Sequence, residues 1–206
     1  MGQSVSANVL VVGLDRSGKS LLTRRLSGCR ASAGKHDVVM PTAALERTRF
    51  QRDGVRWTLL ELKSHSVAET RTLMEPWVSA TSAVIFVVDA SDSIRLAELA
   101  QAFTAVWEEA SAKRLPIAVA VNRGKPVATM DFTVAGDLVH GVDHEVALEL
   151  LPPDGRGLLD ASVTSRLLRL DTKADGRPLK LFEVDALSGN GCDALLAWLR
   201  IHVGGA

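Results

Sequence analysis

Runs of apolar residues alternate along the chain with longer amphipathic stretches, a pattern typical of strands that alternate with helices. The apolar runs predict buried strands at residues 8–12, 83–88 and 116–121. Residues 45–52 and 55–62 read as two more strands, and the Asp-Gly pair between them is a strong hairpin signal. Helices are expected over residues 20–26, over a stretch that ends near residue 80, over about 93–113 and over 192–202. The pattern therefore predicts an α/β protein with a mostly parallel sheet and helices on both faces.

Length and composition agree with one domain. At 206 residues the chain is long for one α/β unit and short for two, so residues 1–206 are expected to form a single domain. Hydrophobic residues make up 47% of the chain, and no apolar run is long enough to span a membrane. The formal net charge is +0, so nothing indicates a nucleic-acid partner. Cys29 and Cys192 lack the spacing of metal ligands, which favours unpaired thiols in a reducing compartment and a cytoplasmic protein.

Residues 13–20, with the sequence GLDRSGKS, fit G-x-x-x-x-G-K-[ST], the phosphate-binding P-loop. The motif lies between a predicted strand and a predicted helix, as it requires. Its glycines allow a tight turn close to a phosphate, its lysine brings charge to the β- and γ-phosphates, and its last hydroxyl can ligate Mg²⁺. The alternative is a glycine-rich turn without a ligand. The predicted nucleotide-binding residues of the loop are Asp15, Arg16, Ser17, Gly18, Lys19 and Ser20.

The first six residues, MGQSVS, fit the N-myristoylation pattern M-G-x-x-x-[ST], with Gly2 as the acceptor. An ordinary polar N-terminus is the alternative reading. One myristoyl chain anchors a protein only marginally and reversibly, and no polybasic cluster follows to strengthen the attachment. We therefore expect a cytoplasmic protein for which weak peripheral membrane attachment through myristoyl is an open alternative.

These motifs resemble those of a small GTPase of the Ras superfamily, and within it the Arf-like (ADP-ribosylation-factor-like) branch. The likeness covers nearly the whole chain and rests on GLDRSGKS at 13–20, Pro41-Thr42, VIFVVDASD at 84–92 and LSGNG at 187–191. It implies the P-loop NTPase small-GTPase fold, a six-stranded mostly parallel sheet with about five helices, in which strand 45–52 runs antiparallel. It also implies a helix over 160–170 and a last strand at 179–184. The implied ligand is GTP or GDP, with Mg²⁺ as cofactor held by Ser20 and Thr42.

The chain departs from the family where hydrolysis is controlled. The family motif D-x-x-G-Q corresponds here to Glu61, Leu62, Lys63, Ser64 and His65. Glu61 is one methylene too long for the usual water-mediated grip on Mg²⁺. Ser64 replaces the glycine whose N–H meets the γ-phosphate, and His65 replaces the glutamine that orients the attacking water. We therefore predict no catalytic residue, with Ser64 kept as a nucleotide contact.

The base-reading motif N-K-x-D is also altered, to Asn122-Arg123-Gly124-Lys125. The family aspartate accepts hydrogen bonds from guanine, whereas the Lys125 side chain has no acceptor. Leaving the guanine donors unpaired should cost about 1–3 kcal/mol each. The backbone N–H of Ala186 stands where the family contacts guanine O6. We expect Asn122, Arg123, Lys125 and Ala186 to lie at the base, and discrimination between GTP and ATP to be poor.

Two further features concern partners. Residues 127–157 are an acidic insertion between the base-reading loop and the next helix, expected to be a solvated or partner-binding loop. The resemblance also implies an apolar effector surface between the two switch segments, at Leu45, Leu60 and Trp77. Ordinary core packing is the alternative for both leucines.

Three functional hypotheses remain open. The first is an Arf-like GTP-binding switch or adaptor with weak or absent hydrolysis, which the intact P-loop favours. The second is an active GTPase whose altered motifs are compensated by a partner. The third is a pseudo-GTPase that serves as a structural subunit of a larger assembly. In each case the partner is a protein effector or assembly rather than a nucleic acid.

Overall fold

The fold is built on a six-stranded sheet with the strand order β2-β3-β1-β4-β5-β6. The computed structural model describes residues 5–28, 45–64, 66–123, 159–173 and 176–203. Only β2 and β3 pair in the antiparallel direction, and all other neighbouring strands of the described residues are parallel. The strands are β1 (Val5–Val12), β2 (Leu45–Arg52), β3 (Val55–Leu62), β4 (Ala83–Asp89), β5 (Ile117–Asn122) and β6 (Leu179–Val184). The predicted sheet and its antiparallel strand are confirmed.

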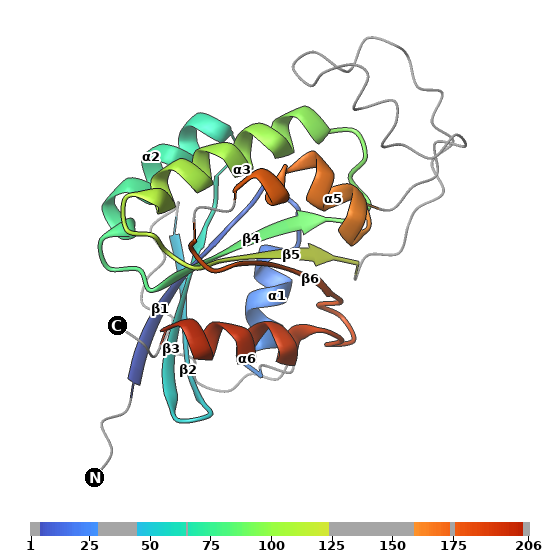
Figure 1. The fold of residues 1–206 in the computed structure, drawn as a ribbon. Helices are drawn as coiled ribbons and strands as arrows, with labels where there is room; N and C mark the ends of the chain where they lie inside the picture. The colour runs from blue at the N-terminus through green and yellow to red at the C-terminus, as the bar shows by residue number, and fades with distance from the viewer. Residues whose placement is uncertain (1–4, 29–44, 65, 124–158, 174–175, 204–206) are drawn as a thin grey trace.

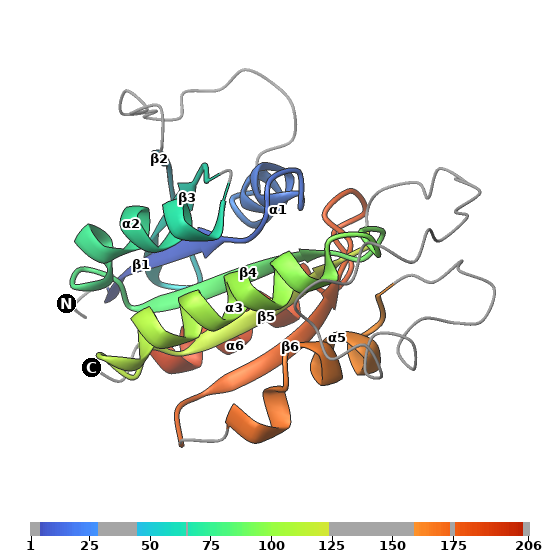
Figure 2. The same cartoon turned by 90° about the horizontal axis from the view of Figure 1, so that it is seen from above.

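Helices cover both faces of the sheet (Figure 1). One face packs under α2, α3 and α5, and the other packs against α1 and α6. Viewed from above, α2 and α3 lie side by side along the first of these faces (Figure 2). The helices are α1 (Lys19–Leu26), α2 (Val67–Val78), α3 (Leu96–Ser111), α5 (Ala161–Leu167) and α6 (Cys192–Val203), with the short 3-10 helix η1 (Leu170–Lys173) after α5. Two hydrophobic cores result, one on each side of the sheet.

The position of each strand in the sheet explains its sequence. β4 and β5 lie inside the sheet with helices on both faces, and every residue of both strands is buried. β2 and β6 are the edge strands, and their residues alternate more between exposed and buried positions. Continuous apolar sequence therefore marks the inner strands, and mixed sequence marks the edges.

Several predicted boundaries shift by up to three residues, and two of these shifts have a clear physical cause. The helix predicted over residues 160–170 ends at Leu167, because Arg169 has a φ of 51°, a left-handed value that an α-helix does not contain. The chain then continues as η1. β1 begins at Val5 rather than at residue 8, since Ser6 and Asn8, although polar, pair in register with β3. Backbone pairing extends this strand beyond its apolar run.

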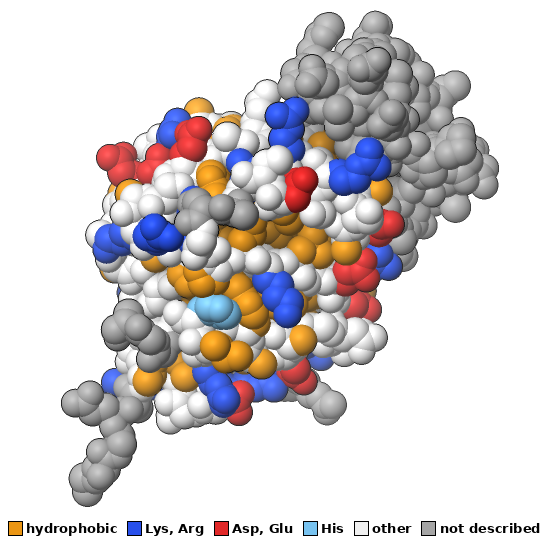
Figure 3. Space-filling view, viewed as in Figure 1, with side chains coloured by type: hydrophobic (Ala, Val, Ile, Leu, Met, Phe, Trp, Pro, Cys, Tyr) orange, Lys and Arg blue, Asp and Glu red, His pale blue; other side chains and the backbone are white. Residues whose placement is uncertain are grey.

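Apolar side chains also gather on the surface along the β6 edge. Figure 3 shows hydrophobic side chains across the face that lies between α5 and α6 in Figure 1. Ile201 of α6 is 70% exposed, and Leu179 and Leu181 of β6 are half-buried. Lys180 and Glu183 lie exposed on the same strand. Charged side chains on an edge strand oppose its pairing with a strand of another chain. Lys180 and Glu183 therefore protect β6 from such pairing, although the side chains around this strand are apolar.

The helices of the described residues include none with the length and apolar character needed to cross a bilayer. Cys192, at the start of α6, is a buried free thiol, and burial raises its pKa to about 11. A thiol with so high a pKa stays protonated and unreactive at neutral pH. The predicted insertion at 127–157 lies outside the described residues.

The turn before α6 requires glycine at one position. Gly191 has a φ of 74°, and a Cβ there would lie 2.1 Å from the carbonyl oxygen of Glu183. Gly54 in the β2–β3 hairpin has a similar φ of 78°, but a Cβ at that position would have no atom within 4 Å of it. A substitution by alanine would therefore strain the backbone at both positions, because both have a positive φ. Only at Gly191 would the new Cβ also collide with a backbone atom.

Gly191→Ala is expected to lower the free energy of unfolding by at least about 3 kcal/mol, because strain and a backbone collision act together. Gly54→Ala is the matched control and should cost only about 1 kcal/mol, the strain alone. Urea denaturation of both variants measures the difference. Equal losses would show that the turn relaxes to admit the methyl group.

Candidate functional site

The P-loop joins the end of β1 to the start of α1 and passes very close to two neighbouring strands. A Cβ at Gly13 would lie 2.3 Å from the carbonyl oxygen of Val87 in β4. A Cβ at Gly18 would lie 2.2 Å from the side-chain nitrogen of Asn122 at the end of β5. Both glycines also have positive φ, 144° and 92°. Glycine is therefore required at these two positions because the loop passes so close to β4 and to Asn122, and the predicted approach to a phosphate stays a prediction.

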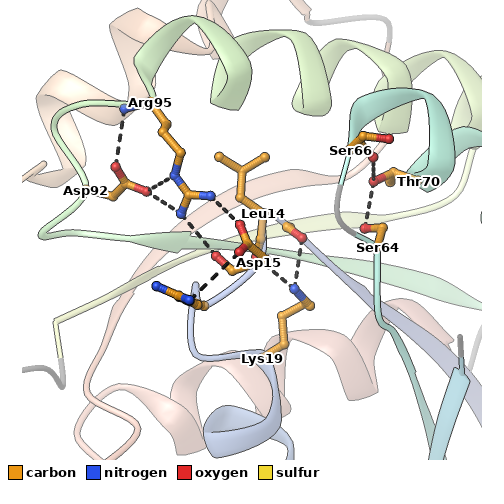
Figure 4. A network of polar contacts seen from close by, with 10 residues as sticks. Leu14, Asp15, Lys19, Ser64, Ser66, Thr70, Asp92 and Arg95 are labelled. Carbon is orange, nitrogen blue, oxygen red and sulfur yellow. Dashed lines mark hydrogen bonds and ion pairs between the residues drawn. The ribbon is translucent and has the colours of Figure 1, made fainter. Parts of the chain in front are cut away.

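Lys19 is buried beneath the loop, with 6% of its surface exposed. Its Nζ donates hydrogen bonds to the carbonyl oxygens of Gly13 at 2.9 Å and Leu14 at 2.7 Å. Figure 4 shows the amino group pointing toward the loop backbone. A buried ammonium group at the amino end of α1 adds a full positive charge to the positive end of the helix dipole. The arrangement is suited to binding an anion such as a phosphate chain.

A hollow of about 500 Å³ opens beside this loop and helix. Ligand sites for small molecules and cofactors usually have volumes of roughly 300–1,000 Å³. The lining residues are three basic side chains and three others, namely Arg16, Lys19, Arg24, Gly18, Ser20 and Leu21. The hollow therefore has a volume within the range of small-molecule sites and a positively charged lining.

Ser20 and Glu61 meet where the P-loop motif places a metal ligand. The Ser20 hydroxyl donates a hydrogen bond of 2.5 Å to a carboxylate oxygen of Glu61. Glu61 ends β3 with only 3% of its surface exposed, and this burial raises the pKa of its carboxyl group, although the hydrogen bond from Ser20 acts in the opposite direction. A hydroxyl and a carboxylate are the oxygen ligands that Mg²⁺ prefers. These two residues therefore fit a hard divalent cation.

An ion-pair cluster ties the P-loop to the start of α3 (Figure 4). The guanidinium group of Arg95 pairs with the carboxylates of Asp15 and Asp92 and donates to the backbone oxygen of Asp15 at 3.0 Å. The hydrogen bond from Arg95 holds the pKa of Asp15 below its usual value. The sequence predicts Asp15 as a nucleotide contact, but here its carboxylate holds the loop in place. No motif points to Arg95, whose only signal in the sequence is its spacing of three residues from Asp92.

Ser64 lies on the other side of the site, just before α2. Its side chain is 3% exposed, and its Oγ shares a hydrogen bond of 2.8 Å with Oγ1 of Thr70. Thr70 also donates to the backbone oxygen of Ser66 at 2.9 Å, while Ser66 caps α2 by accepting from the N–H of Glu69 at 3.2 Å. The position that a glycine occupies in the family is thus filled by a side chain that is tied to the following helix (Figure 4).

Asn122 connects the phosphate side and the predicted base side of the site. Its amide nitrogen donates to the backbone oxygen of Ser17 at 3.3 Å, and its amide oxygen accepts from the N–H of Ala186 at 3.2 Å. Arg25 of α1 donates to the carbonyl oxygen of Ala186 at 3.0 Å. The N–H of Ala186 is the group expected to meet guanine O6, and in this structure it donates to Asn122.

Arg123 points to β6. Its guanidinium group donates to a carboxylate oxygen of Glu183 at 2.6 Å, and the same oxygen accepts from the N–H of Ala161 at 3.1 Å. The sequence predicts this guanidinium group at the base. To stack on a base, the Arg123 side chain would have to give up its hydrogen bond with Glu183.

The predicted effector surface is only partly exposed. Leu45 and Leu60 are buried in the core beneath α2 and α3, so core packing accounts for both leucines in this conformation. Trp77 is half-buried, and the guanidinium group of Arg47 lies 5.7 Å from its ring centre. Of the three residues, Trp77 is the one with surface available to a partner.

Parts of the predicted motifs lie outside the described residues, among them Gly2, Thr42, His65 and Lys125. The described residues contain no cluster of three or more histidine, cysteine, aspartate or glutamate side chains that could hold a metal ion. Of the predicted metal ligands Ser20 and Thr42, only Ser20 belongs to the described residues, and Glu61 lies beside it.

The strand order, the P-loop between β1 and α1 and the elements around it define a P-loop protein with the small-GTPase fold. A solved structure of the Arl6 BBS3 small GTPase from Trypanosoma brucei with bound nucleotide analogue GppNp matches it with a TM-score of 0.66 and 21% identity, over 97% of this chain and 98% of that chain. At this identity the match shows the shared fold.

The sequence model of the Arf (ADP-ribosylation factor) family matches residues 1–135, and the chain belongs to this family of small GTP-binding proteins. It is 25% identical over 198 residues to ADP-ribosylation factor-like protein 6 of Danio rerio, covering 95% of this chain and 88% of that protein. It is 24% identical over 199 residues to the small COPII coat GTPase SAR1 of Giardia intestinalis, covering 96% and 90%. The predicted Arf-like resemblance is confirmed.

Asn122→Ala should lower the free energy of unfolding by about 2 kcal/mol or more, because it leaves the backbone oxygen of Ser17 and the N–H of Ala186 buried without their partner. Asn190→Ala, at an exposed asparagine of the nearby loop, is the control and should stay within about 0.5 kcal/mol of the native protein. Chemical denaturation monitored by circular dichroism gives both values. A native-like Asn122→Ala variant would contradict the structural role of this side chain.

Proposed function

We propose that this Arf-family protein binds a nucleoside triphosphate or diphosphate and acts as a switch or adaptor for a partner protein, with weak or absent hydrolysis. The observation that carries the proposal is the contrast between the two sides of the site. The P-loop, with Lys19 buried beneath it, is complete, whereas Ser64 and Glu61 occupy the positions on which hydrolysis depends in the family.

The phosphate side supports binding. Lys19 lies under the loop, and a Cβ would collide with the backbone of Val87 at Gly13 and with the side chain of Asn122 at Gly18. A phosphate chain in the hollow would meet backbone N–H groups, the Lys19 ammonium group and the start of α1, all of which favour negative charge. In the Trypanosoma brucei relative of the same fold, a nucleotide analogue is bound.

The switch side argues against efficient hydrolysis. A movement of Ser64 toward a γ-phosphate would break its hydrogen bond with Thr70 unless the start of α2 moved with it. The Cβ and hydroxyl of Ser64, which are buried in this structure, would then have to pack in a different position. His65 follows Ser64 in the sequence and stands in place of the family glutamine. Its imidazole side chain, which has no amide group, would have to orient the attacking water.

Mg²⁺ would be held by the Ser20 hydroxyl, with Glu61 beside it and Thr42 completing the ligands. When bound, the ion neutralises phosphate charge and orients the phosphate oxygens. Glu61 already accepts the hydroxyl hydrogen of Ser20, which leaves the lone pairs of the Ser20 oxygen for a ligand. The chain's own residues thus position the donor oxygen.

Base discrimination is proposed to be poor. Lys125 removes the acceptor that reads guanine, and the remaining candidate, the N–H of Ala186, already donates to Asn122. A base that used this N–H would have to compete with an internal hydrogen bond. Affinity would therefore come mainly from the phosphates.

A structural subunit of a larger assembly, without a nucleotide-dependent switch, is the second candidate. The tie between Ser64 and Thr70 favours it, because this tie orders the start of α2 without any ligand. In both cases the partner is a protein, and the half-buried Trp77 is the candidate for contact. Weak membrane attachment through a myristoyl group on Gly2 stays a prediction.

Lys19→Ala should abolish stabilisation by nucleotide, because the charge facing the phosphates is lost. For the native protein, a nucleotide at 100 times its dissociation constant should add about 2.7 kcal/mol to the free energy of unfolding. Thermal melting with Mg²⁺-GTP and Mg²⁺-ATP measures this for both proteins, and the two nucleotides should differ in affinity by less than about a hundredfold. Lys180→Ala, on the exposed edge strand, is the charge-matched control. Absence of any shift in the native protein would favour the structural-subunit hypothesis.

Single-turnover hydrolysis of GTP is expected at or below about 10⁻⁴ s⁻¹, the slow intrinsic rate of small GTPases. His65→Gln alone should leave this rate unchanged, because Ser64 and Glu61 still differ from the family motif. Phosphate release from the loaded protein, followed over hours, gives the rate. A rate of the order of 1 s⁻¹ in the isolated native protein would rule out the adaptor hypothesis in this form.

A further inference from the structure

Arg25 lies in the last turn of α1, the helix that follows the P-loop, and it contacts the loop between β6 and α6. This loop, residues 185–191, is here termed the base loop. The Nε of Arg25 donates a hydrogen bond of 3.0 Å to the carbonyl oxygen of Ala186. A Cβ at Gly189 would lie 3.3 Å from the Cδ of Arg25, so the stem of this side chain lies against the same loop. Arg25 thus connects the phosphate side of the site directly to the predicted base side.

The two peptide groups that flank the Cα of Ala186 are held by hydrogen bonds. In the first group, the N–H of Ala186 donates to the side chain of Asn122 at 3.2 Å. In the second group, the N–H of Leu187 donates to the carboxylate of Asp185 at 2.8 Å, and the carbonyl oxygen is the one that accepts from Arg25. Of these three partners, Asn122 and Arg25 lie outside the base loop. They therefore fix the orientation of Ala186 relative to the rest of the site.

The charge of Arg25 also acts on the base loop. Hydrogen bonds from Ser188 hold the pKa of Asp185 below its usual value, and the positive charge of Arg25 acts in the same direction. A cation in the last turn of a helix also stabilises the helix itself, but Arg24 lies in the same turn and supplies such a charge. Stabilisation of α1 therefore does not account for the contact between Arg25 and the base loop.

We propose that Arg25 is a positioning residue for the base side of the site, because it holds the base loop against the helix that begins with Lys19. Ala186 is only 1% exposed, so loss of the donor would leave its carbonyl oxygen buried without this partner. The base loop would then rearrange to reach water or another donor, and the geometry that it offers to a base would change. The P-loop would keep its shape, because its contacts with β4 and Asn122 do not involve Arg25.

This inference rests on the proposed function, because it requires a nucleotide whose base lies beside Ala186. It adds a residue that belongs to none of the sequence motifs and that acts through the base loop rather than on the ligand. The property to measure is therefore the affinity for a nucleotide relative to the affinity for a phosphate chain alone. This ratio separates positioning of the base loop from a general contribution of Arg25 to folding, which would affect both ligands.

The experiment compares the affinity for GDP with the affinity for inorganic pyrophosphate, both in excess Mg²⁺ and both from displacement of fluorescently labelled GDP. Arg25→Met keeps an unbranched side chain but loses the donor and the charge, and it should bind GDP at least about tenfold more weakly than the native protein. Its affinity for pyrophosphate should stay within about threefold of the native value, because the P-loop is unchanged. Arg25→Lys, which keeps a donor and the charge, should have a ratio of the two affinities within about threefold of the native ratio.

Arg200→Met is the matched control, since Arg200 is an exposed arginine in the last turn of α6 and its loss removes the same charge from the same kind of position. Its ratio should equal that of the native protein, and melting without ligand should show that all variants are folded. An equal loss of GDP and pyrophosphate in Arg25→Met would show a general contribution to the fold, and a native affinity for GDP would show that the base loop is positioned without Arg25. Either result would overturn the inference and leave the proposed function intact, whereas failure of the native protein to bind any nucleotide would overturn both.

Discussion

The close approach of the P-loop to the strand ends is the constraint on which the rest of the site depends. Gly13 lies against the backbone of β4, and Gly18 lies against the side chain of Asn122 at the end of β5. No side chain of these two residues separates the loop from the sheet, so the loop adopts the shape that the two strands impose on it. Lys19 and Ser20 then begin α1 at a position and direction fixed by the sheet rather than by a ligand.

Around this fixed loop, the other parts of the site have changed in different ways. On the switch side, side chains occupy the space: Ser64 bonds to Thr70, and Glu61 bonds to Ser20. On the base side, the Ala186 N–H is taken by Asn122, and Arg123 is paired with Glu183. The P-loop geometry is therefore intact, whereas the groups predicted to meet the base and the γ-phosphate make internal contacts. This distribution explains why binding and hydrolysis are separated in the proposed function.

The fold was predictable because its signals are local. A continuous apolar run such as residues 83–88 can only be an inner strand or a buried helix, and its length decides for the strand. The P-loop was predictable because glycine, lysine and serine act there through backbone geometry and charge. Arg95 was not predictable, because its partner Asp15 is 80 positions away in the sequence. The burial of Leu45 and Leu60 also depends on α2 and α3 packing over them, which no pattern within β2 or β3 reveals.

Asn122 couples the phosphate side of the site to the predicted base side. Its one side chain bonds to the backbone on both sides, at Ser17 and at Ala186. Any shift of the loop on phosphate binding therefore changes the hydrogen bond available to the base, and thermodynamic linkage makes the effect reciprocal. Inorganic pyrophosphate and a free nucleoside, although they share no bond, would thus change each other's affinity through this amide.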